Sequence, residues 1–313
     1  MNSNFQFFGN KEKLKSSPLL LTLGNFDGVH LGHKHILNYI RDLKKENESF
    51  AVVTFDPHPI FYFDKNKKNY LIYSLEYRIQ ELLKICDVVI VQKFIDDFAN
   101  QSHEEFCQNW LLKNFHPRKV FLGFNFTYGK NRLGNSETFE KFASKNRIQF
   151  ETLPAYKHKE EFISSSLIRK AILKNDFLLV QELLAQPFFI DGIVIHGDKR
   201  GRQIGFPTAN IKIDEKRILP QNGVYACRVQ IENEMNQYHA VMNIGVRPTV
   251  QQEVLEIHVE AHLFDYNGDL YGKKIKYFPV QFIREERKFS NFLELKEQIK
   301  LDSEKSKIIL GEK

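Results

Sequence analysis

The sequence predicts an α/β protein in which a parallel-sheet domain is followed by an antiparallel β-barrel. In the first half, short apolar runs such as 19–23 alternate with stretches of helical periodicity, a pattern typical of a parallel sheet covered by helices on both faces. After Pro187, strand-like segments follow one another without intervening helices, which favours antiparallel pairing in a small closed barrel. We therefore expect two domains, residues 1–185 and residues 186–313, the second a six-stranded barrel with a terminal helix.

The composition indicates a cytoplasmic globular protein. The chain has 313 residues, of which 42% are hydrophobic, so it can bury two cores. The sequence has no apolar run of the roughly 20 residues that span a bilayer, and no signal-peptide pattern, so we expect no membrane contact. Its three cysteines are scattered and lack metal-ligand spacing, which indicates reduced thiols. The net charge of +6 suits anionic substrates or nucleic acid, although a solvated lysine-rich surface accounts for most of it.

The first half predicts four strands, at 19–23, 51–55, 88–91 and 119–122. A helix that begins near His33 places its apolar residues on one face. Ser74 is positioned to cap a second helix, and Ser102–Glu105 forms a capping box before a third. The apolar residues that share one face are Ile36, Leu37, Ile40 and Leu43 in the first helix and Leu75, Ile79, Leu82 and Leu83 in the second. In the third, Phe106, Trp110 and Leu111 are expected to face the core.

The segment after the first predicted strand has the features of an anion site. A strand, a glycine turn and a helix N-terminus direct free backbone N–H groups and the helix dipole at one place. His30 and His33 add two imidazoles there, and Gly32 between them would let a phosphate approach closely. The predicted phosphate-binding residues of this turn are Gly24, Asn25, Phe26, Asp27 and Gly28.

Three further segments of the first half carry candidate binding residues. Asp56 and His58 stand at a strand end, where open α/β sheets bind ligands. The loop 123–134 has the glycines, aromatic rings and cations expected of a segment that stacks a flat ring and touches phosphate. Serines at a helix start are first of all caps, but three in a row before an arginine also form a phosphate cradle. The candidates are Asn125, Phe126, Tyr128 and Arg132 in the loop, and Ser164, Ser165, Ser166 and Arg169 at the helix.

The sequence pattern of the second half predicts strands at 190–195, 224–231, 239–244, 257–263 and 275–282. A helix over 290–300 follows, with Phe292, Leu293, Leu295 and Ile299 on its apolar side. A basic glycine loop could wrap a polyphosphate, or could be a simple hairpin; its candidates are Gly197, Lys199, Gly201, Arg202 and Gly205. Thr208 and Asn210 present two oxygen ligands on one face of an extended segment, which suits Mg²⁺. Glu256 and Glu260 are four residues apart on one strand face, so periodicity cannot choose between them as a general base.

The residues 24–33, Gly-Asn-Phe-Asp-Gly-Val-His-Leu-Gly-His, resemble the HxGH motif of nucleotidyltransferases. In its longer form the motif resembles that of the bacterial bifunctional riboflavin kinase/FMN adenylyltransferases. Ile-Ser-Ser-Ser-Leu-Ile-Arg at 163–169 is similar to the motif that completes the ATP site of that family. The loop 123–134 is similar too, although Asn125 stands where the family often has aspartate.

The second half resembles the riboflavin kinase module, in family order. The similar segments are 192–210, 219–226, 243–249, 259–262 and 269–272. The resemblance implies that Glu260, which has the family spacing before Asp-Leu-Tyr-Gly, is the general base, that Thr208 and Asn210 hold Mg²⁺, and that the 197–205 loop orients phosphates. Gln186 stands where the family usually has arginine.

The resemblance implies an enzyme that phosphorylates riboflavin to FMN and then adenylylates FMN to FAD. ATP is the co-substrate of both steps, and FMN and FAD are product and substrate rather than prosthetic groups. It implies flavin contacts from Asp56, His58 and the 123–134 loop, and no nucleic-acid partner. We expect a monomer or a weak homo-oligomer. Two alternatives stay open: an enzyme with one inactive module, to which the Asn125 and Gln186 departures point, and a flavin- or RNA-binding regulator without turnover.

Overall fold

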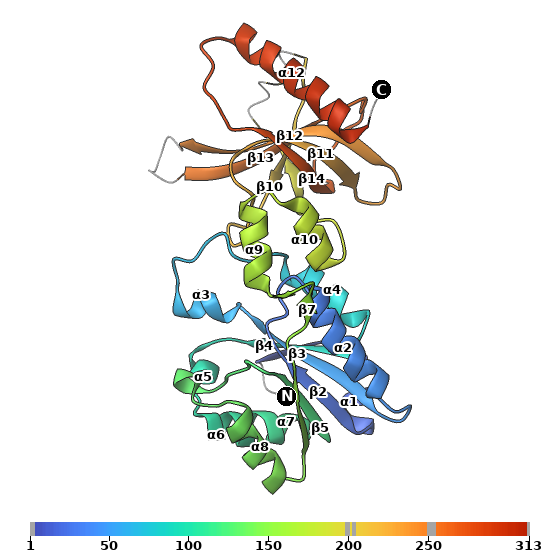
Figure 1. The fold of residues 1–313 in the computed structure, drawn as a ribbon, viewed down its shortest axis with the longest axis vertical. Coiled ribbons are helices and arrows are strands. Elements are labelled where there is room, and N and C mark those ends of the chain that lie inside the picture. The colour runs from blue at the N-terminus through green and yellow to red at the C-terminus, as the bar shows by residue number, and fades with distance from the viewer. Residues whose placement is uncertain (1–3, 198–200, 202–204, 249–254, 312–313) are drawn as a thin grey trace. The chain divides into compact units, whose positions relative to one another are not determined.

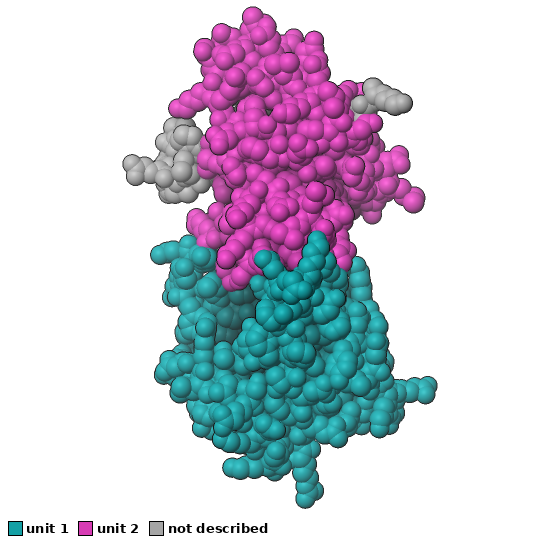
Figure 2. All heavy atoms as spheres, viewed as in Figure 1, with its two compact units in different colours: residues 1–67, 71–165 teal, residues 68–70, 166–313 magenta. Residues whose placement is uncertain are grey.

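A computed structural model describes residues 4–197, 201, 205–248 and 255–311 of the chain (Figure 1). The chain packs as two compact units (Figure 2). Unit 1 consists of residues 1–67 and 71–165, and unit 2 of residues 68–70 and 166–313. The short segment 68–70 thus leaves the first half of the sequence to pack with the second.

Unit 1 is built on a six-stranded sheet with the strand order β1-β4-β3-β2-β5-β6. The strands from β2 to β6 are mutually parallel, and β1 is antiparallel to β4. Their bounds are β1 Phe5–Gly9, β2 Leu19–Leu23, β3 Ser49–Asp56, β4 Val88–Lys93, β5 Lys119–Gly123 and β6 Gln149–Leu153. The predicted parallel sheet is confirmed, and the structure adds the two edge strands β1 and β6.

Helices cover both faces of this sheet, as predicted. Leu19, Leu21 and Leu23 pack in one core with helices that follow β4 and β5, whereas Leu20 packs in a second core with α2 and α4. This alternation is the period of a strand. The helical segments are α1 Lys13–Ser16, α2 Leu31–Leu43, α3 Pro59–Phe63, α4 Leu75–Leu83, α5 Asp96–Ala99, α6 His103–Glu105, α7 Lys113–Phe115, α8 Ser136–Lys145 and the 3₁₀ turn Lys130–Arg132; β7 Lys157–His158 and β8 Glu161–Phe162 form a small hairpin.

The predicted helix starts at Ser74 and Ser102 are confirmed. The Ser74 side chain accepts a hydrogen bond from Tyr77 N, and Ser102 and Glu105 form the reciprocal capping box. The helix after Ser102 continues as a π-helix over Phe106–Leu112, which the sequence pattern does not distinguish from an α-helix. Phe106 and Trp110 are core residues, as expected.

Unit 2 contains a closed antiparallel barrel with the strand order β10-β13-β12-β11-β14-β9. Two helices precede it, α9 Ser165–Leu173, whose first residue belongs to unit 1, and α10 Phe177–Leu184. The strands are β9 Ile190–Ile195, β10 Ala209–Lys212, β11 Gly223–Ile231, β12 Gln237–Pro248, β13 Leu255–Leu263 and β14 Lys274–Arg284. The predicted six-stranded barrel is confirmed, and its sixth strand is the four-residue β10.

The terminal helix α12 (Phe292–Leu310) packs on the barrel and extends beyond the predicted segment 290–300, and its buried residues lie in that extension. Of the residues expected on its apolar side, Leu295 and Ile299 are half-buried, whereas Phe292 and Leu293 are 56% and 67% exposed. The buried residues are Asp302, Ser303, Ser306 and Leu310. Asp302 accepts hydrogen bonds from Arg284 Nε at 3.0 Å and Nη2 at 2.7 Å, and Ser306 donates to Ala240 O. The predicted apolar side is therefore buried only in part, and polar residues nearer the end of the helix supply its hydrogen bonds to the barrel.

We expect Asp302→Asn to lower the free energy of unfolding by about 2 kcal/mol, because it weakens a two-pronged charged interaction whose acceptor side chain is buried. Chemical denaturation followed by far-ultraviolet circular dichroism measures this. Glu304→Gln on the same helix is the matched control, since its pairing with Lys300 at 4.0 Å is exposed and should contribute under about 0.5 kcal/mol. Equal stability of the two variants would contradict the anchoring role of Asp302.

Candidate active sites

The turn after β2 carries the candidate anion site of unit 1. Leu23 ends the strand, and Gly24 N donates to Val53 O on the neighbouring strand. Three residues of the turn have positive φ, namely Phe26 (48°), Gly28 (82°) and Val29 (40°). Val29 N donates to Phe26 O at 3.1 Å, which closes the turn just before α2. The backbone therefore makes a tight turn directly before the N-terminus of α2.

His30 and His33 lie face to face at that N-terminus. His30 is the N-cap of α2, and its Nδ1 accepts a hydrogen bond from His33 N at 3.3 Å. The two rings are stacked with centroids 3.6 Å apart. A Cβ on Gly32 would lie only 3.2 Å from His30 Nδ1. The glycine therefore makes room for an imidazole, which is a more direct reason for it than the phosphate approach we expected.

Burial, the proximity of His30 and the cation of Arg78 all lower the pKa of His33, well below 6.5. His33 is therefore neutral near pH 7. Its Nδ1 is buried and has no hydrogen-bond partner among the described residues. A buried imidazole nitrogen without a partner is costly in a folded protein unless a ligand satisfies it.

The Asp27 side chain has a structural role, because it is buried and hydrogen-bonded to the backbone. Its side chain is 2% exposed, and both carboxylate oxygens accept from Ile72 N, at 3.1 and 3.2 Å. Its backbone carbonyl accepts from Ser165 Oγ at 2.9 Å, which brings the 163–165 segment to the turn. Ser164 is exposed beside it. The Asp27 carboxylate therefore fixes the turn to residue 72, and Ser165 fixes the turn to the start of α9.

Ser166 and Arg169 belong to unit 2. Ser166 is exposed, whereas Arg169 is 9% exposed. Arg169 Nε donates to Tyr70 O at 2.7 Å, and its guanidinium carbon lies 3.7 Å from the centre of the Tyr70 ring. The 68–70 segment thus holds this arginine in one orientation.

Asp56 and His58 occupy the end of β3 as predicted, but in different environments. Asp56 is exposed, and its peptide bond to Pro57 is cis. His58 is 7% exposed, and its Nδ1 accepts from Ile60 N at the start of α3. Asp56 thus remains open to solvent, whereas His58 serves as a helix cap.

The loop 123–134 is held by backbone hydrogen bonds and by packing against the core. Tyr128 pairs with Gly134 through two backbone hydrogen bonds. Its ring is 5% exposed and packs on Phe106 and Phe139 in the core. Tyr128 is therefore a packing residue, in contrast to our expectation of a flavin contact. Asn125 and Arg132 are exposed, and Phe126 is half-buried.

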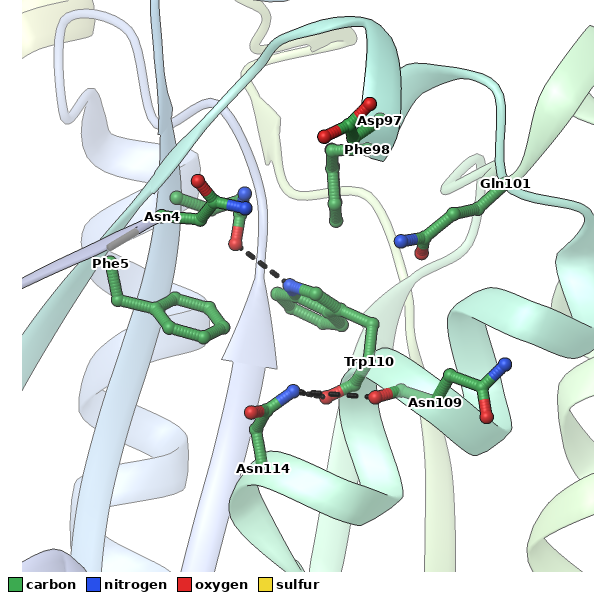
Figure 3. A pocket seen from close by; sticks show the side chains of 9 residues that line it. Asn4, Phe5, Asp97, Phe98, Gln101, Asn109, Trp110 and Asn114 are labelled. Atoms are coloured by element: carbon green, nitrogen blue, oxygen red, sulfur yellow. Dashed lines mark hydrogen bonds between the residues drawn. The ribbon is translucent and has the colours of Figure 1, made fainter. Parts of the chain in front are cut away.

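A polar pocket lies elsewhere in unit 1, beside Trp110 (Figure 3). Trp110 Nε1 donates to Gln92 Oε1 at 2.8 Å, and Asn114 Nδ2 donates to Trp110 O at 2.7 Å. None of the predicted site residues lines it. We therefore assign the candidate chemistry to the His30 turn and not to this pocket.

The barrel of unit 2 brings together the second group of predicted residues. Asn210 on β10 stands directly opposite Glu260 on β13, and Glu260 stands opposite Asn243 on β12. Thr208 Oγ1 donates to Glu260 Oε2 at 2.9 Å, and Asn210 Nδ2 donates to Thr208 Oγ1 at 3.3 Å. A hydroxyl, an amide and a carboxylate therefore form one connected group.

The strand register distinguishes Glu256 from Glu260, which periodicity alone could not do. β10 pairs with residues 259–261 of β13, so Glu260 faces Asn210 across the ladder. Glu256 pairs instead with Arg247, beyond the end of β10. Register therefore associates Glu260 with Thr208 and Asn210.

The three glycines of the predicted glycine loop lie among the described residues. A Cβ on Gly197 would lie 2.6 Å from Asn210 Nδ2, so the glycine is needed for the amide to fit. A Cβ on Gly201 would lie 2.3 Å from Phe206 O, and Gly205 has φ +89°. Lys199 and Arg202 lie outside the described residues.

Sequence reasoning missed Arg78, which is 4% exposed on α4. Its position relative to Leu75, Ile79 and Leu82 is that of a buried helix face. A cation in an otherwise apolar stripe is the signal that could have identified it.

Two family models match separate parts of this chain. The family model for FAD synthetase matches residues 12–167, and that for riboflavin kinase matches residues 184–310. A Bacillus subtilis bifunctional riboflavin kinase/FMN adenylyltransferase is 38% identical over 94% of this chain and 93% of its own length. The Haemophilus influenzae protein of the same description is 37% identical over 92% of each chain. This chain belongs to the bifunctional riboflavin kinase/FMN adenylyltransferase family.

The family membership establishes both activities: riboflavin is phosphorylated to FMN, and FMN is adenylylated to FAD. A solved structure titled macrolide-efflux protein, from Streptococcus pneumoniae, superposes with a TM-score of 0.80 at 27% identity. It covers 93% of this chain and 94% of its own, so it shares the architecture of both units. In the part of the chain that the structure describes, every helix is too short or too polar to cross a membrane.

Proposed function

We propose that the two activities reside in the two groups of residues described above. Residues 1–185 would carry adenylylation and residues 186–313 riboflavin phosphorylation. The observation that carries the proposal is the pair of independent polar clusters, one at the start of α2 and one across β10 and β13. Their chemistry differs, since imidazoles and a helix N-terminus suit polyphosphate, whereas a carboxylate beside a hydroxyl suits deprotonation of an alcohol.

In the adenylyl transfer, an oxygen of the FMN phosphate attacks the α-phosphorus of ATP. That bond forms as the α–β bridging bond breaks, and pyrophosphate leaves. His30 and His33 would stabilise charge on the phosphates, with the unpartnered Nδ1 of His33 as one contact. Family resemblance adds Ser165, Ser166 and Arg169 as further phosphate contacts, and Asn125, Phe126 and Asp56 as flavin contacts.

In the kinase reaction, the 5′-hydroxyl of riboflavin attacks the γ-phosphorus of ATP and ADP leaves. Glu260 would accept the hydroxyl proton. The Thr208 hydroxyl, which donates to Glu260 at 2.9 Å, orients that carboxylate. Phosphoryl transfer depends mainly on positioning and on charge stabilisation, so a pre-formed hydrogen-bonded cluster is well suited to it.

The Thr208, Asn210 and Glu260 cluster also fits a magnesium ion. Each of these side chains carries an oxygen atom that could bind the metal, and oxygen ligands suit Mg²⁺. Gly197 leaves the space that a Cβ would otherwise fill beside Asn210. When bound with ATP, the ion neutralises charge on the phosphates. Thr208 and Asn210 are the residues that would hold it. A cytoplasmic location, and a monomeric or weakly oligomeric state, stay predictions.

Thr208→Val tests this assignment because valine keeps the shape but removes the hydroxyl. We expect riboflavin phosphorylation to fall roughly 10²-fold, and the Mg²⁺ concentration for half-maximal rate to rise. Thr208→Ser, which keeps the hydroxyl, should stay within about threefold of the parent protein. Steady-state assays over a Mg²⁺ series measure both quantities. Full activity with an unchanged Mg²⁺ dependence in Thr208→Val would rule out the role of the hydroxyl.

A further inference from the structure

Arg78 is a buried cation at the base of the His30 turn. It is 4% exposed and shares the inner face of α4 with Leu75, Ile79 and Leu82. Arginine is almost never fully buried unless a specific partner compensates for the loss of water. Its partners therefore indicate what the residue is for.

Those partners are two backbone carbonyls from different strand ends. Nη1 donates to Asn25 O, in the turn that leads to His30, at 2.8 Å. Nη2 donates to Phe55 O, near the end of β3, at 3.2 Å. One rigid guanidinium thus joins the turn to the neighbouring strand, and a lysine ammonium cannot reproduce this planar fork.

The charge of Arg78 is compensated only at a distance. Asp27, Asp56 and Glu76 stabilise it electrostatically, while burial lowers its pKa. Among the described residues, no carboxylate forms a salt bridge with it within 4.0 Å. The positive charge therefore contributes to the potential at the turn, where His33 on α2 experiences it.

We propose that Arg78 is a positioning residue for FMN adenylylation, which fixes the Asn25 turn against β3 and thereby sets where His30 and His33 meet the phosphates of ATP. This inference rests on the proposed role of the two histidines. It assigns two separable effects to one side chain: geometry through the two carbonyls, and charge through the electrostatic potential.

Two variants separate these effects. Arg78→Lys keeps the charge but loses the fork, so we expect kcat for FAD formation from FMN to fall roughly 10- to 100-fold with little change in KM for ATP. Arg78→Met loses both, so kcat should fall and KM for ATP should rise. In NMR titrations the His33 midpoint should rise in Arg78→Met, because one cause of its low pKa is gone, and stay near the parent value in Arg78→Lys.

Lys145→Met is the matched control, because it removes an exposed cation from the last turn of α8, another helix of unit 1, and should leave FAD formation unchanged. Riboflavin phosphorylation reports only on the second site, so chemical denaturation followed by far-ultraviolet circular dichroism checks that unit 1 is folded in every variant. A parent-like kcat in Arg78→Lys, or an unmoved His33 midpoint in Arg78→Met, would overturn the inference. If His30→Ala formed FAD at the parent rate, the proposed role of the histidines would fail instead, so the two failures are distinguishable.

Discussion

Glu260→Gln should abolish the conversion of riboflavin to FMN while leaving the adenylylation of supplied FMN intact. Glutamine keeps the size and the strand position of the side chain, but it cannot accept the proton of the attacking hydroxyl. Loss of a general base costs roughly 10²- to 10⁴-fold in rate. Chromatography of flavins after incubation with riboflavin and ATP measures the loss, and incubation with FMN and ATP measures the retained activity.

Glu256→Gln is the matched control for this experiment. Glu256 is on the same strand, but it pairs with Arg247 rather than with Asn210. We expect riboflavin phosphorylation within about threefold of the parent rate. If Glu256→Gln lost the kinase activity and Glu260→Gln kept it, the assignment from strand register would be wrong. Equal loss of both activities in Glu260→Gln would point to misfolding or to a shared site.

His30→Ala should remove FAD formation and leave FMN formation intact. The substitution deletes an imidazole that would stabilise charge on the phosphates, an effect of roughly 10²- to 10³-fold for one donor. It also deletes the N-cap of α2, since His30 Nδ1 accepts from His33 N. Loss of a cap costs about 1 kcal/mol of stability, which alone would not stop catalysis. Rates of FAD formation from FMN, and of FMN formation from riboflavin, measure the two outcomes.

His30→Asn separates the imidazole from the cap. Asparagine is among the best N-cap residues, so its side chain should replace the hydrogen bond to His33 N. We expect this variant to unfold at nearly the same denaturant concentration as the parent protein, yet to form FAD as slowly as His30→Ala. Parent-like FAD formation in His30→Asn would show that the residue acts only as a cap.

The sequence predicted the buried parts of the fold better than its edges. The four central strands of the sheet are apolar runs because both of their faces are covered, and all four were predicted. The edge strands β1 and β6 keep many exposed or half-buried positions, so neither has a continuous apolar run. The sequence pattern indicates only an extended segment at the short β10, since four residues carry too little periodicity.

Residue type and spacing predict the candidate sites, but not the contacts that each side chain makes. His30 and His33 were found from their spacing, and Thr208, Asn210 and Glu260 are joined as a group by hydrogen bonds. The burial of Tyr128 depends on its contacts with Phe106 and Phe139, which are distant in sequence. Periodicity does not distinguish Glu256 from Glu260, and the family spacing implies Glu260. The register with β10, which no property of the β13 sequence contains, places Asn210 opposite that same residue.

A complementation assay tests the central claim of two separate active sites most directly. Glu260→Gln and His30→Asn are each incubated with riboflavin, ATP and Mg²⁺, alone and mixed, and the flavins are separated by chromatography. We expect riboflavin alone from Glu260→Gln, FMN alone from His30→Asn, and FAD from the mixture, because FMN released by one variant is adenylylated by the other. Absence of FAD from the mixture, with each variant retaining its own remaining activity, would contradict the account of two independent sites that exchange free FMN.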